Sequence, residues 1–333
     1  MNALVTGATG FIGSTLIELL SAHGFEVFAL MRKTSSSANL EGLKYTRIEG
    51  DMRDEESLRR AVATADYVFH VAGVVAGPNR QYYFDHNTKT TASLARIVSE
   101  VRPGLTRFVF VSSLAAGGPV NSLRPRDETQ PDHPVSAYGE SKLEAERELL
   151  RFKSVFPITI VRPPMVYGPR DKGVFVVIKS ISRNLMPLLA GAGEGGHKYY
   201  SAIHAKDLCR GIVQAAEAPA ASVPSGEVFY LSGDGIHTYQ ELLGTIAKKL
   251  NRKPLKIRVP KFAVMALAAG GSALGALTKK TFALNLDKVN ELLPDYWICS
   301  NEKAKAILGF SPEYDLSSGM ADAIEWYKRQ KWI

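Results

Sequence analysis

Thr6-Gly7-Ala8-Thr9-Gly10-Phe11-Ile12-Gly13 decides the fold of this chain, because of what stands on either side of it. The apolar run Ala3-Leu4-Val5 precedes it and predicts a buried strand, while apolar residues at helical spacing follow it. Glycines between a strand and an amphipathic helix are typical of a turn that binds pyrophosphate at the helix N-terminus. Without such neighbours they would indicate only a tight turn. We assign dinucleotide binding to Gly7, Gly10, Phe11, Ile12 and Gly13.

Short apolar runs and helical stretches alternate through the first half of the chain. This alternation predicts an α/β fold with a doubly wound, parallel (Rossmann) sheet. The expected strands are 3–6, 26–30, 44–48, 67–71, 107–112 and 158–162, and the expected helices are 11–23, 54–64, 88–101 and 137–153.

The regular alternation of expected strands and helices ends after Gly168, where glycine-rich and mainly helical sequence follows. We expect a dinucleotide-binding domain at 1–170, with segments of about 199–232 returning to it. A smaller, mainly helical substrate lobe at 171–198 and 233–333 would then lie over the carboxyl ends of the strands, where such sheets bind ligands.

The uncharged run 262–277 lies within that lobe, between Lys261 and Lys280. Its 16 residues fall short of the roughly 20 that span a bilayer, so we predict no membrane span. We expect a packed helix pair, and a lining for an apolar substrate pocket is the alternative.

Bulk composition limits the classes of protein to which the chain could belong. A hydrophobic fraction of 45% with 22% charged residues is ordinary for a globular protein. The formal charge of +8 would suit a nucleic-acid partner, but the densest basic cluster, 251–258, lacks interleaved aromatics and is typical of a solvated surface.

The cysteines and histidines indicate neither a disulfide nor a metal site. Cys209 and Cys299 have no partner spacing, and His197 and His204 have no recognised ligand pattern, so we predict no disulfide and no metal. The start of the chain carries no basic leader, so we expect a cytoplasmic protein.

Tyr138 and Lys142 are one helical turn apart, so their side chains share a helix face. A free phenol has a pKa of about 10, and a neighbouring ammonium stabilises its phenolate. We therefore expect Tyr138 to be a general acid/base, with Lys142 lowering its pKa and binding the nicotinamide ribose. Ser113 ends the strand 107–112 and is expected to hold the substrate oxygen, while Ser112 caps the turn.

The end of the second strand bears on the choice of cofactor. An acidic residue there would bind the adenosine ribose, whereas an arginine accommodates a 2′-phosphate. The chain has Arg32 and Lys33 and no acid in Leu30-Met31-Arg32-Lys33-Thr34-Ser35. We therefore predict NADP(H). The alternative is that both residues are merely exposed and NAD is used.

These features together resemble the extended short-chain dehydrogenase/reductases, as does Arg162-Pro163-Pro164-Met165-Val166-Tyr167-Gly168-Pro169. The resemblance covers nearly the whole chain, and the tail, with Trp297 and Trp326, is similar to the branch of 3β-hydroxysteroid dehydrogenases and dihydroflavonol reductases. It implies a possible homodimer. It further implies that Asp51 and Met52 flank the adenine, that Ala72 and Gly73 pass beside the cofactor, that Pro163 meets the nicotinamide, and that Asn87 supports Lys142 unless it is a helix cap.

The leading hypothesis is an NADP(H)-dependent oxidoreductase that interconverts a secondary alcohol and a ketone on a bulky apolar small molecule. The main alternative is an NAD-dependent sugar-nucleotide epimerase or dehydratase with transient hydride transfer. A catalytically silent redox-sensing protein of the same fold commonly lacks the tyrosine and lysine, so their presence disfavours that third class.

Overall fold

A computed structural model of the chain describes residues 1–189, 191–278 and 286–333, without the side chains at 261, 267, 272–278 and 286. At its centre is a seven-stranded sheet in the order β11-β6-β5-β4-β1-β2-β3, and every neighbouring pair is parallel. This confirms the doubly wound sheet expected from the sequence. The strands are β1 (Asn2–Thr6), β2 (Glu26–Met31), β3 (Thr46–Glu49), β4 (Tyr67–His70), β5 (Arg107–Val111), β6 (Ile158–Arg162) and β11 (Glu227–Tyr230).

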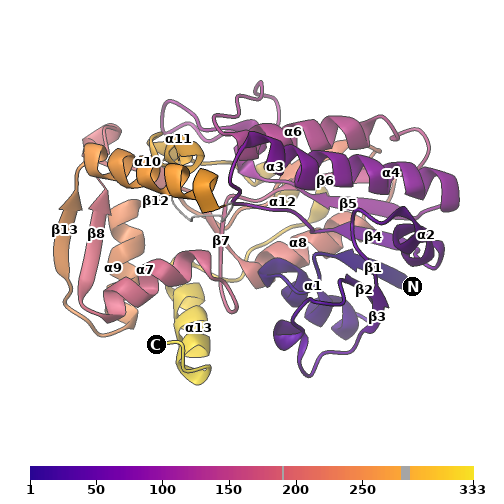
Figure 1. Cartoon of the computed structure of the whole chain (residues 1–333), viewed down its shortest axis with the longest axis horizontal. Coiled ribbons are helices and arrows are strands. Elements are labelled where there is room, and N and C mark those ends of the chain that lie inside the picture. Colours follow the sequence, from indigo (N-terminus) through magenta and orange to yellow (C-terminus); the bar gives the residue numbers. More distant parts are fainter. Residues whose placement is uncertain (190, 279–285) are drawn as a thin grey trace.

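Helices cover both faces of this sheet (Figure 1). One apolar cluster joins one face to α1 and α8, and a second joins the other face to α2, α4 and α6. Most strand residues are therefore fully buried, as in β5, which explains their continuous apolar runs. The helices are α1 (Phe11–Ala22), α2 (Glu55–Ala63), α3 (Arg80–Tyr83), the π-helical turn η2 (Phe84–Thr88), α4 (Lys89–Val101), α5 (Leu114–Gly117), α6 (Ala137–Leu150) and α8 (Ala205–Glu217), with the short 3-10 turn η1 (Ala38–Leu40).

A smaller lobe lies beside the sheet, on the left in Figure 1. Its own core packs α7, α9 and α13 around β7 and β8. The lobe and its connections contain α7 (Gly173–Ser182), α9 (Tyr239–Lys249), α10 (Lys261–Thr278), α11 (Leu286–Leu292), α12 (Glu302–Leu308), α13 (Leu316–Arg329) and η3 (Glu194–Gly196), with short strands β7 (Met165–Tyr167), β8 (Leu185–Leu189), β9 (Tyr199–Tyr200), β10 (Ala202–His204), β12 (His237–Thr238), β13 (Leu255–Val259) and β14 (Tyr296–Trp297).

One expectation for this lobe was wrong. The run 262–277 forms one helix, α10, rather than a helix pair; its described side chains are largely exposed, and Lys280 lies outside the described residues. The basic stretch 251–258 is exposed, as expected of a solvated surface, but part of it forms a strand that the sequence did not indicate, β13, which pairs in parallel with β8. Both elements bury little of their side chains, so their hydrophobic pattern is a weak guide. No helix in the described part of the chain has the length and apolarity to cross a membrane.

The segment after β10 returns to the large sheet, since α8 packs on α1 and β11 pairs with β6. How the chain divides into independent domains stays a prediction.

Candidate active site

The glycine turn between β1 and α1 is closed against the backbone at the end of β4. Gly7 has a φ of +71°, which favours glycine, and a Cβ there would stand 2.6 Å from the nitrogen of Ala72. A Cβ on Gly13 would collide with the carbonyl oxygen of Gly7. Gly10 precedes α1 without a side-chain cap. The turn thus presents backbone N–H groups and the positive end of α1, which fits a pyrophosphate.

One cleft of about 840 Å³ runs along the carboxyl ends of the sheet strands, from this turn to the ends of β5 and β6. Lys33, Asn87 and Lys142 lie outside its lining. The other residues that the sequence assigns to the cofactor or to catalysis line it: Gly7, Gly10, Phe11, Ile12, Gly13, Arg32, Asp51, Met52, Ala72, Gly73, Ser113, Tyr138 and Pro163.

Tyr138 is the second residue of α6, whose first turn is fixed because Ser136 Oγ accepts the N–H of Gly139 at 3.0 Å. Tyr138 is 9% exposed, and the hydroxyl of Ser113 lies near its phenol. Ser113 caps α5 by accepting the N–H of Ala115 at 3.1 Å. Burial raises the pKa of Tyr138 well above its ordinary value, and the nearby Ser113 hydroxyl offsets this only in part. At neutral pH the phenol is therefore a proton donor.

Lys142 follows one turn later and lies behind the wall of the cleft. Its Nζ donates to the carbonyl oxygen of Val111 at 2.7 Å and stands 4.2 Å from the ring centroid of Phe110. A Cβ on Gly73, which lines the cleft, would be 3.6 Å from this Nζ. Burial lowers the pKa of Lys142 to about 7, against a smaller opposing effect of Glu146. The pKa of the Tyr138 phenol is raised rather than lowered, and burial is the largest cause.

A chain of buried hydrogen bonds runs beneath these groups from the glycine turn to α6. Thr6 Oγ1 lies 2.7 Å from His70 Nδ1, and His70 Nε2 lies 2.9 Å from Thr91 Oγ1. Thr91 donates to the carbonyl oxygen of Asn87, whose amide donates to Ser141. Because Thr91 donates onward, it accepts from Nε2, so His70 is the Nε2-protonated neutral tautomer. Burial and then Lys142 lower the pKa of His70 to about 3, which keeps it neutral.

Asn87 also holds the backbone that follows β4. Its Oδ1 accepts the N–H of Val74 at 2.8 Å, and its Nδ2 donates to the carbonyl oxygen of Val74 at 3.1 Å. Asn87 lies inside η2 rather than at a helix start, so the alternative of a helix cap does not fit. Its contacts instead connect the segment at Gly73 with α6.

A buried ion network fixes the opposite side of α6. Arg162, at the end of β6, forms ion pairs with Glu146 at 2.5 Å and with Asp132 at 2.6 Å. Ser112 donates to the same Glu146, so it does not cap the turn as expected. Its neighbour Ser113 is the serine that lies near the phenol.

The sequence missed a group that closes the cleft from the small lobe. Asp287 of α11 accepts the N–H of Ala137 at 2.6 Å, and Glu291 accepts the hydroxyl of the serine that caps α6 at 2.8 Å. Lys288 lines the cleft, pairs with Glu291 at 2.7 Å and stands 5.1 Å from the ring centroid of Tyr138. No motif marks these residues, and only the tertiary fold brings them to α6.

The far end of the cleft holds the residues expected at the adenosine. Arg32 and Asp51 both line it. Partial burial raises the pKa of Asp51, but hydrogen bonds from Arg53 and the charges of Arg53 and Arg32 outweigh this, so the net shift is downward. Asn39, which the sequence did not indicate, donates to the carbonyl oxygen of Thr9 at 3.0 Å and ties the loop after β2 to the glycine turn.

His204 is at the N-cap position of α8, but its side chain forms no cap bond. Its Nε2 lies 3.3 Å from Asp322 Oδ2, and its ring stacks on Tyr314 at 4.0 Å. Within the described ranges, no group of three or more His, Cys, Asp or Glu residues could hold a metal ion.

Known proteins similar to this chain include reductases, dehydrogenases and epimerases. A ceramide reductase from Caulobacter vibrioides is 26% identical over 99% of this chain and 95% of the relative. A decarboxylating sterol-4-alpha-carboxylate 3-dehydrogenase from Dictyostelium discoideum is 26% identical over 96% of this chain and 98% of its own length. The structure of a UDP-glucose 4-epimerase from Thermotoga maritima with UDP-glucose has a TM-score of 0.80 at 22% identity, covering 99% and 100% of the two chains, which shows the fold alone.

The family model described as the NAD dependent epimerase/dehydratase family matches residues 3–231, which is more than half of the chain. The expected resemblance is confirmed by this match and by the dehydrogenase relative. The chain therefore belongs to the NAD-dependent epimerase/dehydratase family of extended short-chain dehydrogenase/reductases and is an NAD(P)-dependent enzyme.

Proposed function

We propose that this enzyme interconverts a secondary alcohol and a ketone on a bulky, largely apolar molecule, with NADP(H) as cofactor and Tyr138 as the general acid/base. The observation that carries the proposal is that Tyr138 and Ser113 both line the cleft that begins at the glycine turn, with the Ser113 hydroxyl near the phenol. A hydroxyl pair of this kind can hold one substrate oxygen from two sides. The Tyr138 O–H can then donate its proton to that oxygen.

The bound nicotinamide supplies or accepts the hydride, and the side chains handle the proton. In the reducing direction Ser113 orients the carbonyl oxygen, and Tyr138 protonates it. The raised pKa of Tyr138 suits this direction, since the phenol is protonated before the reaction. A charged Lys142 behind Gly73 would stabilise the phenolate that the transfer leaves.

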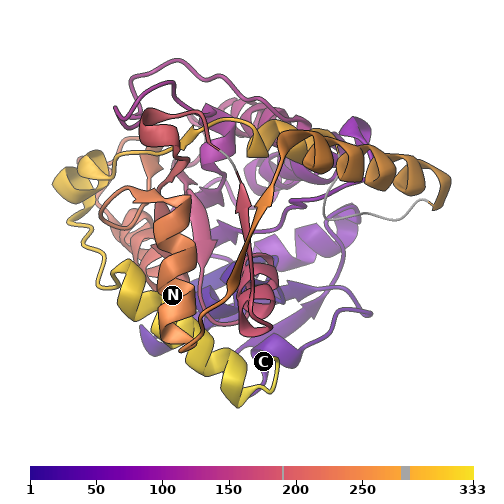
Figure 2. The same cartoon turned by 90° about the vertical axis from the view of Figure 1, so that its left-hand side faces the viewer.

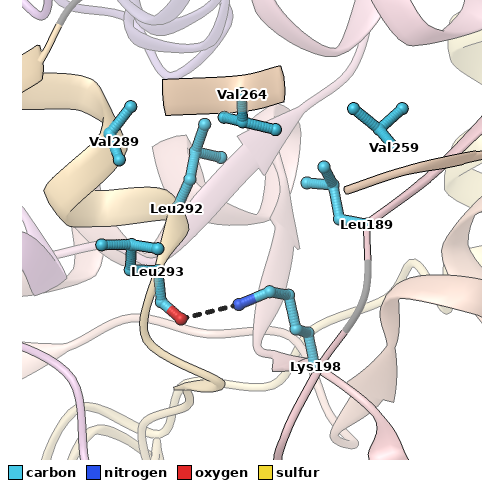
Figure 3. A pocket seen from close by; sticks show the side chains of 7 residues that line it. All are labelled: Leu189, Lys198, Val259, Val264, Val289, Leu292 and Leu293. Atoms are coloured by element: carbon cyan, nitrogen blue, oxygen red, sulfur yellow. Dashed lines mark hydrogen bonds between the residues drawn. The ribbon is translucent and has the colours of Figure 1, made fainter. Parts of the chain in front are cut away.

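An apolar substrate is supported by the names of two relatives rather than by a large apolar cavity. Leu189, Val259 and Val264 line a crevice on the inner side of α10, together with Val289 and Leu292 of α11 and with Lys198 (Figure 3), but at about 20 Å³ this crevice is too small for a substrate. The same α11 carries Lys288, which lines the main cleft. Two relatives are named for a ceramide and a sterol, both largely apolar molecules.

NADP(H) is supported by Arg32, which lines the cleft at the end of β2 where no acid is present. Arg32→Asp should lower the affinity for NADPH about 10- to 100-fold and leave that for NADH nearly unchanged, because one charge-assisted hydrogen bond to a phosphate is worth roughly 1.5–3 kcal/mol. Fluorescence titration with both cofactors measures this, and Lys33→Asp is the matched control outside the cleft. Equal affinities of the wild type and Arg32→Asp for NADPH would show that Arg32 does not bind the cofactor.

The second candidate is an NAD-dependent sugar-nucleotide epimerase or dehydratase, favoured by a relative from Escherichia coli O157:H7 that is named as an N-acetyl-alpha-D-glucosaminyl-diphospho-ditrans,octacis-undecaprenol 4-epimerase and is 26% identical over 98% of this chain. Such an enzyme returns the hydride to its substrate, so it consumes no cofactor overall and tends to retain NAD.

One experiment separates the two candidates. The purified enzyme is analysed by mass spectrometry for retained nucleotide and then assayed with NADPH on a panel of long-chain and steroidal ketones and of UDP- and dTDP-sugars. We expect stoichiometric NADPH consumption with an apolar ketone. Retained NAD, together with conversion of a nucleotide-sugar without net cofactor use, would overturn the proposal.

A further inference from the structure

Acidic residues are absent from one long segment of the chain. Between Glu241 and Asp287 there are nine Lys and Arg residues and no Asp or Glu. The rest of the chain has 32 Lys and Arg against 33 Asp and Glu, so this segment supplies the whole net charge of +8. Basic residues are spread along the chain, but this is its longest stretch without an acidic residue and the one with the largest excess of positive charge.

The basic side chains of this segment are held out in solvent. Arg252 and Lys253 precede β13, and Lys256 and Arg258 lie on it; all four are exposed. None of them forms an ion pair with a residue that the structure describes. Their charge is therefore available to an anionic partner.

Large apolar side chains are exposed at the same place. Leu255 of β13 is 67% exposed and is paired in register with Leu185 of β8, which is 43% exposed. Ile257, two residues further along the same strand face, is 42% exposed. Apolar side chains and unpaired cations thus alternate along this strand and project from its opposite faces, on either side of the edge that pairs with no other described strand.

The helix that follows continues the apolar surface. Phe262 is 75% exposed and Met265 43%, and the two lie one turn apart on α10. The inner side of the same helix carries Val264, over the crevice of Figure 3, and the fully buried Ala268. Figure 2 shows β8 and β13 on the face of the small lobe turned to the viewer, with α10 leading away from the end of β13.

We infer that this surface, formed by Leu185, 252–258, Phe262 and Met265, docks the enzyme on an anionic lipid bilayer. Cations that meet lipid phosphates, next to leucine, isoleucine and phenylalanine side chains that enter the headgroup layer, are the chemistry of interfacial membrane binding. A second copy of the chain would place two unbalanced basic segments against each other, which is electrostatically unfavourable. A nucleic acid would leave the apolar side chains without a partner, and 252–258 has no aromatic residue to stack on bases.

The inference goes beyond the proposed function and does not depend on it. It concerns where the enzyme works, whichever reaction the cleft performs.

Co-sedimentation of the full chain with vesicles tests it. The probes are vesicles of phosphatidylcholine with 30% phosphatidylglycerol and vesicles of phosphatidylcholine alone, at low and at 0.5 M salt. We expect binding to the anionic vesicles that weakens at high salt, and little binding to the neutral ones. Since each basic residue near such a surface contributes roughly 1 kcal/mol, Lys253→Glu/Lys256→Glu/Arg258→Glu should weaken partitioning at least about 100-fold. Phe262→Ser/Met265→Ser should weaken it about tenfold or more.

The matched control is Lys44→Glu/Arg124→Glu/Lys153→Glu, which makes the same charge change at exposed positions outside the surface. It should bind vesicles within a few-fold of the wild type. Equal weakening by the control triple, or unchanged binding by the Lys253/Lys256/Arg258 triple, would overturn the inference. The inference would also be overturned if the protein did not bind vesicles but bound duplex DNA. The same holds if it did not bind vesicles and formed a dimer that Phe262→Ser/Met265→Ser dissociates.

Discussion

The wall of the cleft and the outer face of the small lobe are built in opposite ways. Around α6, charged and polar side chains are inside and hold one another: Arg162 is 5% exposed and pairs with Glu146 and Asp132. On β13 and α10, large apolar side chains are outside, and Phe262 is 75% exposed. The first arrangement fixes atoms in place, whereas the second leaves surface that a partner can cover. Two substitutions and one pH profile test this contrast, and the largest expected effect comes first.

Arg162→Met should produce the largest loss of stability. It leaves the buried carboxylate of Glu146 and the partly exposed one of Asp132 without their cation, and breaking a buried ion pair typically costs about 3–5 kcal/mol. Urea denaturation measures the free energy of unfolding. The control is Arg60→Met, which breaks the exposed pair with Glu56 and should cost less than about 1 kcal/mol. Similar losses in the two variants would contradict the contrast between buried and exposed charges.

The pH dependence of turnover tests whether the lowered pKa of the buried Lys142 affects catalysis. Its pKa is lowered from the ordinary 10.5 to about 7, so the amine loses its proton as the pH rises through about 7. If the ammonium stabilises the phenolate of Tyr138, kcat/KM for ketone reduction should fall up to tenfold per pH unit above that value. The profile of Lys256→Met, a lysine exposed on β13, should match that of the wild type. A wild-type profile that stays flat from pH 6 to 9 would remove Lys142 from the proton chemistry.

Leu255→Ser should have the smallest effect. The side chain is 67% exposed, so its replacement should change the free energy of unfolding by no more than about 0.5 kcal/mol. Leu149→Ser, in the buried apolar cluster beneath α6, should cost several times as much. A large loss of stability for Leu255→Ser in thermal unfolding would show that β13 belongs to the core of the lobe.

The contrast between buried and exposed elements also explains which parts of the fold could be predicted from the sequence. The six expected strands of the sheet agree with the structure to within two residues at each end, since strands buried on both faces require continuous apolar runs. β13 was missed because four of its five residues are exposed, and its partner β8 is about 70 residues away in the chain. Local pattern carries no signal for such a pairing.

For the site, motif spacing predicted which residues line the cleft near the glycine turn and Tyr138, but not how deeply they are buried. Lys142 shares a helix face with the tyrosine, yet its amine lies behind Gly73 and bonds to Val111. Lys288 and Glu291 could not be found, since only the docking of α11 on α6 brings them there. The assigned roles of Ser113, Tyr138, Lys142, Asn87 and the cofactor-binding residues stay predictions.

The central claim is that the phenol of Tyr138 moves the proton at the substrate oxygen, and Tyr138→Phe tests it most directly. The variant should bind NADPH with nearly wild-type affinity, because the glycine turn is untouched, and should lose at least about 100-fold in kcat, the usual contribution of general acid catalysis. Tyr83→Phe, which alters the neighbouring buried tyrosine ring, is the control and should retain turnover. Wild-type turnover by Tyr138→Phe with an identified substrate would contradict the account.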